Sequence, residues 1–348
     1  MSGILVHGLG AVSSAGWGVG PMMTALAADA PLAVAEIPRP GQTKPPRVRT
    51  VPPPPERPAF LAHPRLRRTS PCGQHVVAAA LEAIGDDAFA VQAGGLRLGV
   101  IACTMAGSVA YSRRFYEEAL RDPATASPLI FPETVFNAPA SHLAAYLNSP
   151  TINYSLVGDD GVFLLGLALG AEWLAQERVD CCVVIGDEEL DWVVAEAARL
   201  FNPLTVLSAG AGAVYLKRTP HRSPGGPTAV AALHTVTDPF LFTNRQSRTT
   251  AAKRMRAQLP AESATDALCW GIQGIPAGDA AERAAWADWS GHRQAPKRIL
   301  GEAFAASAAW QCVAACAALR DGNYAAVNVS VVGANEQAIG ARFARAVS

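Results

Sequence analysis

The stretch that decides the fold reads Thr151-Ile152-Asn153-Tyr154-Ser155-Leu156-Val157-Gly158-Asp159-Asp160-Gly161. Residues 151–157 predict a strand, and residues 158–161 lead from it into an apolar helix predicted over 162–176. Residues 98–103 and 179–185 are continuous apolar runs of strand length. Strands without polar alternation are buried on both faces, so the pattern favours stacked α/β layers over an open sheet.

The chain divides by composition at a Pro- and Gly-rich linker, residues 219–227. The linker separates a first half, residues 1–218, from a second half, residues 228–348. In both halves we expect strands around helices. Helices are predicted at 70–84, 109–120, 251–259, 280–289 and 303–319, and further strands at 4–8, at 228–233 and on both sides of Gly333.

Residues 38–68 are rich in proline and arginine and include Pro52-Pro53-Pro54-Pro55. Such a stretch predicts an irregular surface excursion without a regular helix or an inner strand. Its positive charge suits an acidic carrier protein, although a solvated loop without a partner is the simpler interpretation.

Composition limits the classes of partner. The 348 residues are 50% apolar, and the 29 basic residues balance the 29 acidic ones. Because the chain has no net charge, no overall field attracts nucleic acid or a membrane surface. The apolar run at the start is too short and uncharged for a signal peptide, and no run reaches membrane-spanning length. We therefore expect a cytoplasmic protein that binds neither nucleic acid nor membrane.

Neither a metal nor an organic cofactor is indicated. The seven cysteines are scattered without a Cys-x-x-Cys pair, and no histidines and carboxylates show metal-ligand spacing, so we expect the cysteines to fill the core. Gly8 and Gly10 follow a predicted strand, as in a dinucleotide loop. The third glycine of that motif is misplaced, however, and no acidic residue follows a second strand.

The order of sequence landmarks resembles the β-ketoacyl-carrier-protein synthase (ketosynthase) family along nearly the whole chain. The matching segments are Gly8–Ser13, Asn137–His142, Asn153-Tyr154-Ser155, Pro276–Glu282, Lys297–Gly301 and Ala318–Gly322. The resemblance implies an α/β thiolase-like fold, layered αβαβα and made of two related halves.

The departures from the family pattern concern its catalytic residues. In these enzymes a cysteine at a helix N-terminus takes the acyl chain as a thioester, because the helix dipole favours its thiolate. The resemblance places Gly158 at this cysteine. It places Gly271 and Glu302 at the family's two histidines, and it retains Lys297. Glycine cannot be acylated, and an ionised glutamate accepts hydrogen bonds but donates none.

This pattern resembles the chain length factor of type II polyketide synthases, including relatives in highly reducing systems such as aryl polyene synthesis. The resemblance implies a heterodimer with an active ketosynthase, an acyl carrier protein as a further partner, and an acyl tunnel at the shared interface. The strand at 151–157 would pair across the dimer. Candidate tunnel and interface residues are Ser108, Tyr111, Ser112 and Phe115, together with Asn153, Tyr154 and Ser155.

Two alternatives remain. The chain could be a homodimeric enzyme with altered thioester chemistry, a hydrolase or decarboxylase that uses Glu302, Lys297 or the pair Asp159 and Asp160. It could also be a homodimeric acyl-binding scaffold without turnover. The two aspartates also have a simpler explanation, since one of them would cap the helix that follows.

A second group of carboxylates, Asp187, Glu188, Glu189 and Asp191, follows the strand at 179–185. It could be taken for a catalytic carboxylate cluster. A solvated turn beyond the strand is the interpretation that we favour.

Overall fold

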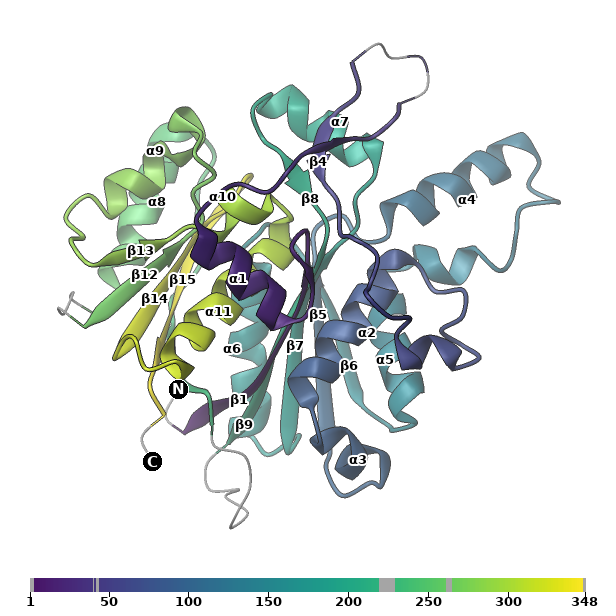
Figure 1. Cartoon of the computed structure of the whole chain (residues 1–348), viewed down its shortest axis with the longest axis horizontal. Helices are drawn as coiled ribbons and strands as arrows, with labels where there is room; N and C mark the ends of the chain where they lie inside the picture. The colour runs from purple at the N-terminus through teal and green to yellow at the C-terminus, as the bar shows by residue number, and fades with distance from the viewer. Residues whose placement is uncertain (1–2, 40, 42–43, 219–228, 261–264, 347–348) are drawn as a thin grey trace.

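The computed structural model describes residues 3–39, 41, 44–218, 229–260 and 265–346, and the predicted linker at 219–227 lies outside them. Within the described residues the strands form a 12-stranded sheet and a 3-stranded sheet. Figure 1 shows the large sheet running through the middle of the molecule with helices on its faces. No helix in this part of the chain is long and apolar enough to cross a membrane.

The large sheet is built from two sets of strands. The first half contributes β1 (Ile4–Ser13), β9 (Gly210–Arg218), β7 (Cys181–Glu188), β5 (Leu98–Thr104) and β6 (Ile152–Val157). The second half contributes β10 (Ala231–Val236), β15 (Gln337–Ala344), β14 (Ala326–Val332), β12 (Asp266–Trp270) and β13 (His292–Gln294). Two short strands, β2 (Gly16–Trp17) and β11 (Phe240–Leu241), pair with β1 and β15.

The two sets repeat one pairing pattern. In the first, β1 and β9 are antiparallel, as are β9 and β7, whereas β7, β5 and β6 are parallel. In the second, β10 and β15 are antiparallel, as are β15 and β14, whereas β14, β12 and β13 are parallel. The sets join where β1 pairs with β10. This repeat confirms the expectation of two related halves.

Helices complete the layers. They are α1 (Val19–Ala28), α2 (Pro71–Ile84), α3 (Asp87–Gln92), α4 (Val109–Arg121), α5 (Ala138–Leu147), α6 (Val162–Ala175), α7 (Trp192–Phe201), α8 (Arg245–Ala257), α9 (Pro276–Ala285), α10 (Pro296–Leu300) and α11 (Phe304–Arg320), with short 3₁₀ turns η1 (Ala59–Ala62) and η2 (Phe131–Thr134). Both α6 and α11 contact strands of both halves, α2 covers the outer face of the first half, and α8 and α9 cover that of the second. The αβαβα architecture is therefore confirmed.

The middle layer shows why these sequences form buried helices. Every residue of α11 except Ala318 and Arg320 is buried, and most are alanine or another small residue. Small side chains let the helix approach the strands of the first half closely, as where Gly186 of β7 and Gly212 of β9 meet its backbone. At each of these glycines an added Cβ would lie within 3.0 Å of α11 atoms. The predicted helix at 303–319 and the apolar helix at 162–176 are thus the centre of the core.

The Pro- and Arg-rich segment departs in one respect from the prediction. Its strand β4 (Arg47–Arg49) lies between β3 (Ala35–Glu36) and β8 (Leu207–Ser208), so it is an inner strand of the small sheet. The expectation that the segment holds no inner strand was wrong. Val48 explains the difference, because it is fully buried in a cluster with Leu207.

Candidate functional site

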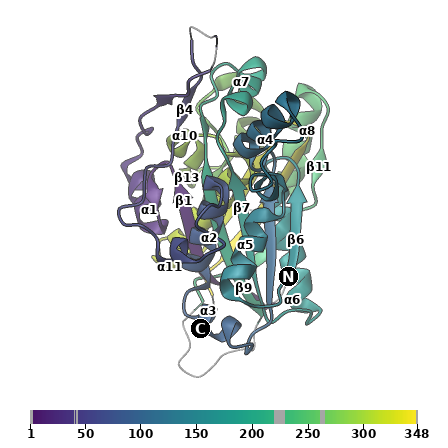
Figure 2. The same cartoon turned by 90° about the vertical axis from the view of Figure 1, so that its right-hand side faces the viewer.

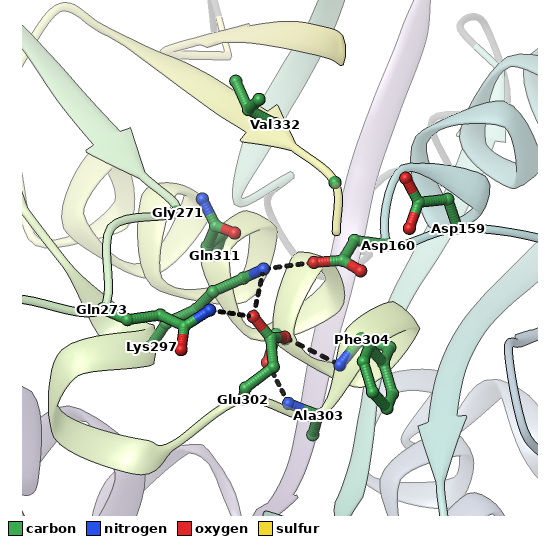
Figure 3. A network of polar contacts seen from close by, with 12 residues as sticks. Asp159, Asp160, Gly271, Gln273, Lys297, Glu302, Ala303, Phe304, Gln311 and Val332 are labelled. Carbon is green, nitrogen blue, oxygen red and sulfur yellow. Dashed lines mark hydrogen bonds and ion pairs between the residues drawn. The ribbon is translucent and has the colours of Figure 1, made fainter. Parts of the chain in front are cut away.

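The equivalent strand–helix junctions of the two halves meet in the middle of the molecule. From the first half comes the β6–α6 junction, and from the second comes the segment that joins α10 to α11. Figure 3 shows the contact between them. The Lys297 ammonium donates to the Asp160 carboxylate and to Glu302 Oε2, the latter at 2.8 Å. All three side chains are at most 3% exposed, so they form a buried ion triad.

Local backbone structure fixes the Glu302 side of the triad. The short helix α10 ends at Gly301, whose φ of 97° turns the chain sharply. The Glu302 backbone then bonds to the small sheet, donating to Val206 O at 2.9 Å and accepting from Ser208 N at 2.7 Å. Phe304 follows with φ of 43°, rare for an aromatic residue, and its N–H donates to Glu302 Oε1 at 2.9 Å. Such local strain is typical of sites whose geometry the fold imposes.

The charges in the triad do not balance when both carboxylates are ionised. Burial disfavours the charged form of Lys297, but Asp160 and Glu302 outweigh burial and raise its pKa. Burial, and then the charge of Asp160, raise the pKa of Glu302 to about 7. A proton on Glu302 makes the triad neutral, because one ammonium then faces one carboxylate. Gln273 Nε2 also donates to Glu302 Oε2, at 2.8 Å.

Of the two glycines that the resemblance placed at catalytic positions, Gly271 lies beside Lys297, and Gly158 follows β6, two residues before Asp160. Neither has a positive φ, so the backbone would accept a side chain at either one. A Cβ at Gly158 would meet Val162 Cγ2 at 3.3 Å, and a Cβ at Gly271 would meet Glu282 Oε2 at 3.4 Å and Lys297 Cε at 3.6 Å. The site therefore has room for the first atoms of a side chain but offers neither a thiol nor an imidazole there.

Asp159 and Asp160 bond to different groups. Asp159 points away from the triad (Figure 3) and accepts from the backbone N–H groups of Asn335, Glu336 and Gln337, at 3.0–3.3 Å. Burial, and then Asp160, raise the pKa of Asp159. Neither aspartate caps α6, whose N-cap Gly161 makes no side-chain cap bond, so the capping explanation was wrong.

Sequence reasoning missed three residues of the site. Gln311 lies in α11 and donates to Ser330 O at 2.8 Å, while its Oε1 has no partner among the described residues. Glu282 accepts from Gly271 N at 3.1 Å, and burial raises its pKa to about 7. Gln273 holds Glu302. The signal for Gln311 was its position as a lone amide in an alanine-rich helix, where a buried polar side chain needs a partner.

The candidate tunnel and interface residues lie away from the triad's contacts. Ser108 is buried and its Oγ has no partner among the described residues, whereas Tyr111, Ser112 and Phe115 are half-buried on α4. The helix α4 buries no residue fully. Figure 2 shows α4 and β6 on the same side of the molecule. On β6, Tyr154 is 48% exposed.

The turn η2 and the residues after it link α4 to β6. Ser112 Oγ donates to Thr134 O at 3.4 Å, and Ser155 Oγ donates to Phe136 O at 3.3 Å. Asn153, beside Tyr154 on β6, is half-buried, and its Oδ1 has no partner among the described residues. The structure thus brings the α4 residues and the β6 residues to one side of the molecule.

The acidic group after the strand at 179–185 is buried, so its assignment as a solvated turn was wrong. Glu188 accepts from Met105 N, and from Ala106 N at 3.1 Å. Glu189 accepts from Ala110 N at 2.9 Å. These bonds satisfy backbone donors at the start of α4, which explains how carboxylates without a nearby cation are tolerated in the interior.

The other two members of this acidic group have side-chain partners. Asp187 accepts from the Cys72 thiol at 2.8 Å, and burial raises the pKa of Asp187 to about 7. Asp191 caps α7 through Val193 N at 2.9 Å and pairs with Arg113 at 2.9 Å. The group therefore anchors α4 and α7. Among the described residues no cluster of three or more His, Cys, Asp or Glu side chains could hold a metal ion.

Comparison with known proteins gives the fold. No protein-family model matches the sequence, and no curated protein matches it. Among solved structures, the chain is similar to the ishigamide ketosynthase/chain length factor, with 19% identity, full coverage of both chains and a TM-score of 0.79. It is also similar to a β-ketoacyl synthase from Burkholderia phymatum, with 16% identity, full coverage of both chains and a TM-score of 0.80.

A third similar structure is a ketosynthase bound to a hexaketide, in complex with its type II polyketide synthase acyl-carrier protein. The identity is 12%, the coverage is 99% of both chains and the TM-score is 0.76. The chain therefore has the ketosynthase form of the thiolase fold, as the resemblance predicted.

Proposed function

We propose that this chain is a non-catalytic subunit, similar to a chain length factor, that pairs with an active ketosynthase and shapes the acyl tunnel at their interface. The acyl chain would be carried by an acyl carrier protein and bound covalently only by the partner. The proposal places the product class in type II polyketide or related highly reducing biosynthesis.

One observation carries the proposal: the same strand, β6, ends at a junction without a nucleophile and presents an unpaired edge. Gly158 at the end of β6 has no side chain to acylate, and the neighbouring Asp160 is held by the Lys297 ammonium. β6 is the last strand in the order of the large sheet and pairs only with β5 in the described part of the chain. An open edge of this kind is a template for a strand of another chain.

Exposed apolar side chains beside β6 support pairing through this edge. Val157 of β6 is 52% exposed. Around η2, Leu129, Phe131 and Phe136 are 66%, 53% and 46% exposed. Large apolar surface gathered beside a sheet edge is characteristic of a protein–protein interface. An acyl tunnel at this interface would be lined in part by α4.

A second candidate function follows from the pKa of Glu302. Burial and the charge of Asp160 raise the pKa of Glu302 toward the range of a general acid or base at neutral pH. A homodimeric hydrolase or decarboxylase acting on acyl thioesters would use it with Lys297. Against this candidate, both carboxylate oxygens of Glu302 are already engaged by Lys297, Gln273 and Phe304 N–H. The chain-length-factor proposal needs no rearrangement of these bonds.

Co-expression with a candidate ketosynthase partner tests the choice. We expect the two proteins to co-purify as a heterodimer, and mass spectrometry of the working complex to find acyl adducts on the partner alone. A stable homodimer that never co-purifies with a ketosynthase would refute the proposed pairing. The two alternatives, an acyl-binding scaffold and an enzyme with altered thioester chemistry, would then remain. If the chain alone consumes an acyl thioester and Glu302→Ala abolishes this activity, the chain is an enzyme with altered thioester chemistry.

The tunnel assignment has its own test. Phe115 packs on Phe131 with ring centroids 5.3 Å apart, so its truncation opens space beside α4 without touching the triad. We expect Phe115→Ala or Tyr111→Ala to lengthen the products of the heterodimer, measured by mass spectrometry of the released chains. Tyr116→Ala, on the same helix but 63% exposed, is the matched control. An unchanged product distribution in both tunnel variants would show that α4 does not line the tunnel.

A further inference from the structure

The helix α8 carries the largest net charge of the helices that the structure describes. Its 13 residues include five cations and no carboxylate: Arg245, Arg248, Lys253, Arg254 and Arg256. Among the residues that the structure describes, none of the five forms an ion pair. This concentration contrasts with the zero net charge of the whole chain.

Helix stability does not account for all of these charges. Arg254 and Arg256 lie in the last turn, where the helix dipole favours cations. Arg245 and Arg248 lie in the first turns, where the dipole disfavours them, and no acidic residue offsets the effect. The first turn is stabilised instead by a capping box between Asn244 and Ser247.

Aromatic rings hold three of the cations without neutralising them. Arg256 lies 4.4 Å from the Trp286 ring centroid, Arg254 lies 4.5 Å from that of Phe240, and Arg248 lies 5.5 Å from that of Phe242. A ring quadrupole attracts a cation but carries no net charge. The guanidinium groups are therefore fixed in place while their charge remains available to a partner.

The neighbouring helix α9 places a further cation at the surface. Its Asp279 and Glu282 are buried, whereas Arg283 is half exposed and pairs with Asp279 at 3.5 Å. The cations Arg283 and Arg293 lie 5.5 and 5.1 Å from the Trp270 ring centroid. Beside the exposed face of α8 lies an open hollow of about 380 Å³, bordered by Leu241, Gln246, Thr250, Arg254 and others. Arg254 is the cation at the border of this hollow, and exposed cations beside an open surface suit an acidic macromolecule.

We propose that the exposed face of α8 is a docking surface for an acidic protein, with Arg245, Lys253 and Arg254 as its main contacts. These three residues are exposed, while the opposite face of α8 packs its alanines and Met255 into the core. The acidic carrier protein expected from the sequence is one partner of this kind. The docking surface would then be α8 and not the Pro- and Arg-rich segment at 38–68.

The location of α8 connects this surface to the site. Arg248 donates to Gly333 O at 2.9 Å, immediately before the loop whose N–H groups hold Asp159. A partner bound at α8 therefore lies one loop away from Asp159, the neighbour of the triad residue Asp160 in the sequence. The surface is also independent of the pairing proposed for β6, because α8 packs on β15 and α9, on the opposite side of the molecule from α4 (Figure 1).

The test measures binding of a fluorescent, glutamate-rich helical peptide to the intact protein by anisotropy. The triple variant Arg245→Glu, Lys253→Glu, Arg254→Glu should weaken binding by about tenfold, because several attractive pairs become repulsive. The matched control, Arg57→Glu, Arg67→Glu, Arg68→Glu, reverses three exposed cations of the Pro- and Arg-rich segment. We expect the control to change binding by less than about twofold, within the small effect of remote charges.

Three outcomes would overturn the proposal. The first is an α8 variant that binds the peptide as tightly as the unmodified protein does. The second is a control variant that loses as much affinity for the peptide as the α8 variant does. The third is tighter binding of duplex DNA, or of vesicles containing phosphatidylserine, than of the peptide. If the charge-reversed helix fails to fold, as far-ultraviolet circular dichroism would reveal, the variant with glutamine at the same three positions replaces it. An unchanged affinity in that variant refutes the proposal equally.

Discussion

The outer strands of the two halves, β6 and β13, occupy equivalent places in the repeated sheet order. β6 presents the exposed apolar residues Tyr154 and Val157, whereas β13 consists of His292, Arg293 and Gln294. Polar and charged side chains discourage pairing at a sheet edge, and apolar ones permit it. The same topology therefore leaves one edge suited to another chain and the other edge suited to solvent.

The ends of the equivalent strands β7 and β14 also differ in polarity, but here the first-half strand is the polar one. β7 ends in the buried carboxylates Asp187 and Glu188, whereas β14 ends in Val331 and Val332. The middle-layer helices α6 and α11, which follow the edge strands β6 and β13, begin beside the ion triad. The first half contributes one carboxylate to the triad, and the second half contributes Lys297 and a carboxylate. The repeated backbone thus sets where groups meet, and the side chains at strand ends decide what they do.

The largest expected effect comes from breaking the contact between the halves. Lys297→Met would leave Asp160 and Glu302 buried without their cation. Removing one partner of a buried ion pair typically costs about 3–5 kcal/mol of unfolding free energy. We expect a loss of this size in denaturant-induced unfolding at neutral pH.

A neutral version of the triad is the control for that loss. Lys297→Met combined with Asp160→Asn and Glu302→Gln removes the uncompensated charges while it keeps polar groups near Phe304 N–H. This combination should regain at least half of the lost stability, because the desolvated charge causes most of the loss. A single Lys297→Met variant that loses less than about 1 kcal/mol would show that the triad is not a buried ionic contact.

A smaller effect, on the dissociation constant of the dimer, should distinguish the β6 edge from the β13 edge. Val157→Lys places a charge on β6, where half of the residue is exposed, and an edge lysine blocks strand pairing. We expect the dissociation constant of the dimer that forms, with a ketosynthase or with itself, to rise by about thirtyfold, or about 2 kcal/mol. His292→Lys on β13 is the matched control and should leave the constant unchanged. Equal weakening by both variants would contradict the distinction between the edges.

Much of the fold could be predicted because it depends on local pattern. The apolar runs that predicted the strands at 98–103 and 179–185 became β5 and β7, and the helix predicted at 70–84 became α2. The resemblance also brought Gly271, Lys297 and Glu302 to one site, where the structure places them side by side. These successes needed only the order of elements and their family landmarks.

The rest depended on partners far away in the sequence. Asp160, and not Asp159, meets Lys297, which lies 137 residues away. Glu188 is buried because it accepts N–H groups of Met105 and Ala106, more than 80 residues before it. A run of carboxylates after a strand looks like a solvated turn until those donors are known. Local composition contains no information on such pairs.

The smallest expected effect concerns the carboxylate that distinguishes β7 from β14. Because burial raises the pKa of Asp187 from 3.8 to about 7, the folded state binds its proton more tightly than the unfolded state does. The stability that this proton contributes is present at low pH and is lost as pH rises toward the folded-state pKa. Between about pH 6 and pH 8 the loss is about 1.4 kcal/mol for one such group.

Asp187→Asn should remove this pH dependence, because an amide does not titrate while its oxygen can still accept from the Cys72 thiol. We expect the difference in unfolding free energy between the two pH values to be smaller in the variant by about that amount. Asp288→Asn, at an exposed position, is the control and should leave the slope unchanged. An identical slope in Asp187→Asn and the unmodified protein would mean that Asp187 does not change its protonation between these pH values, and would contradict the raised pKa. The end of β7 would then differ from the apolar end of β14 in polarity but not in its response to pH.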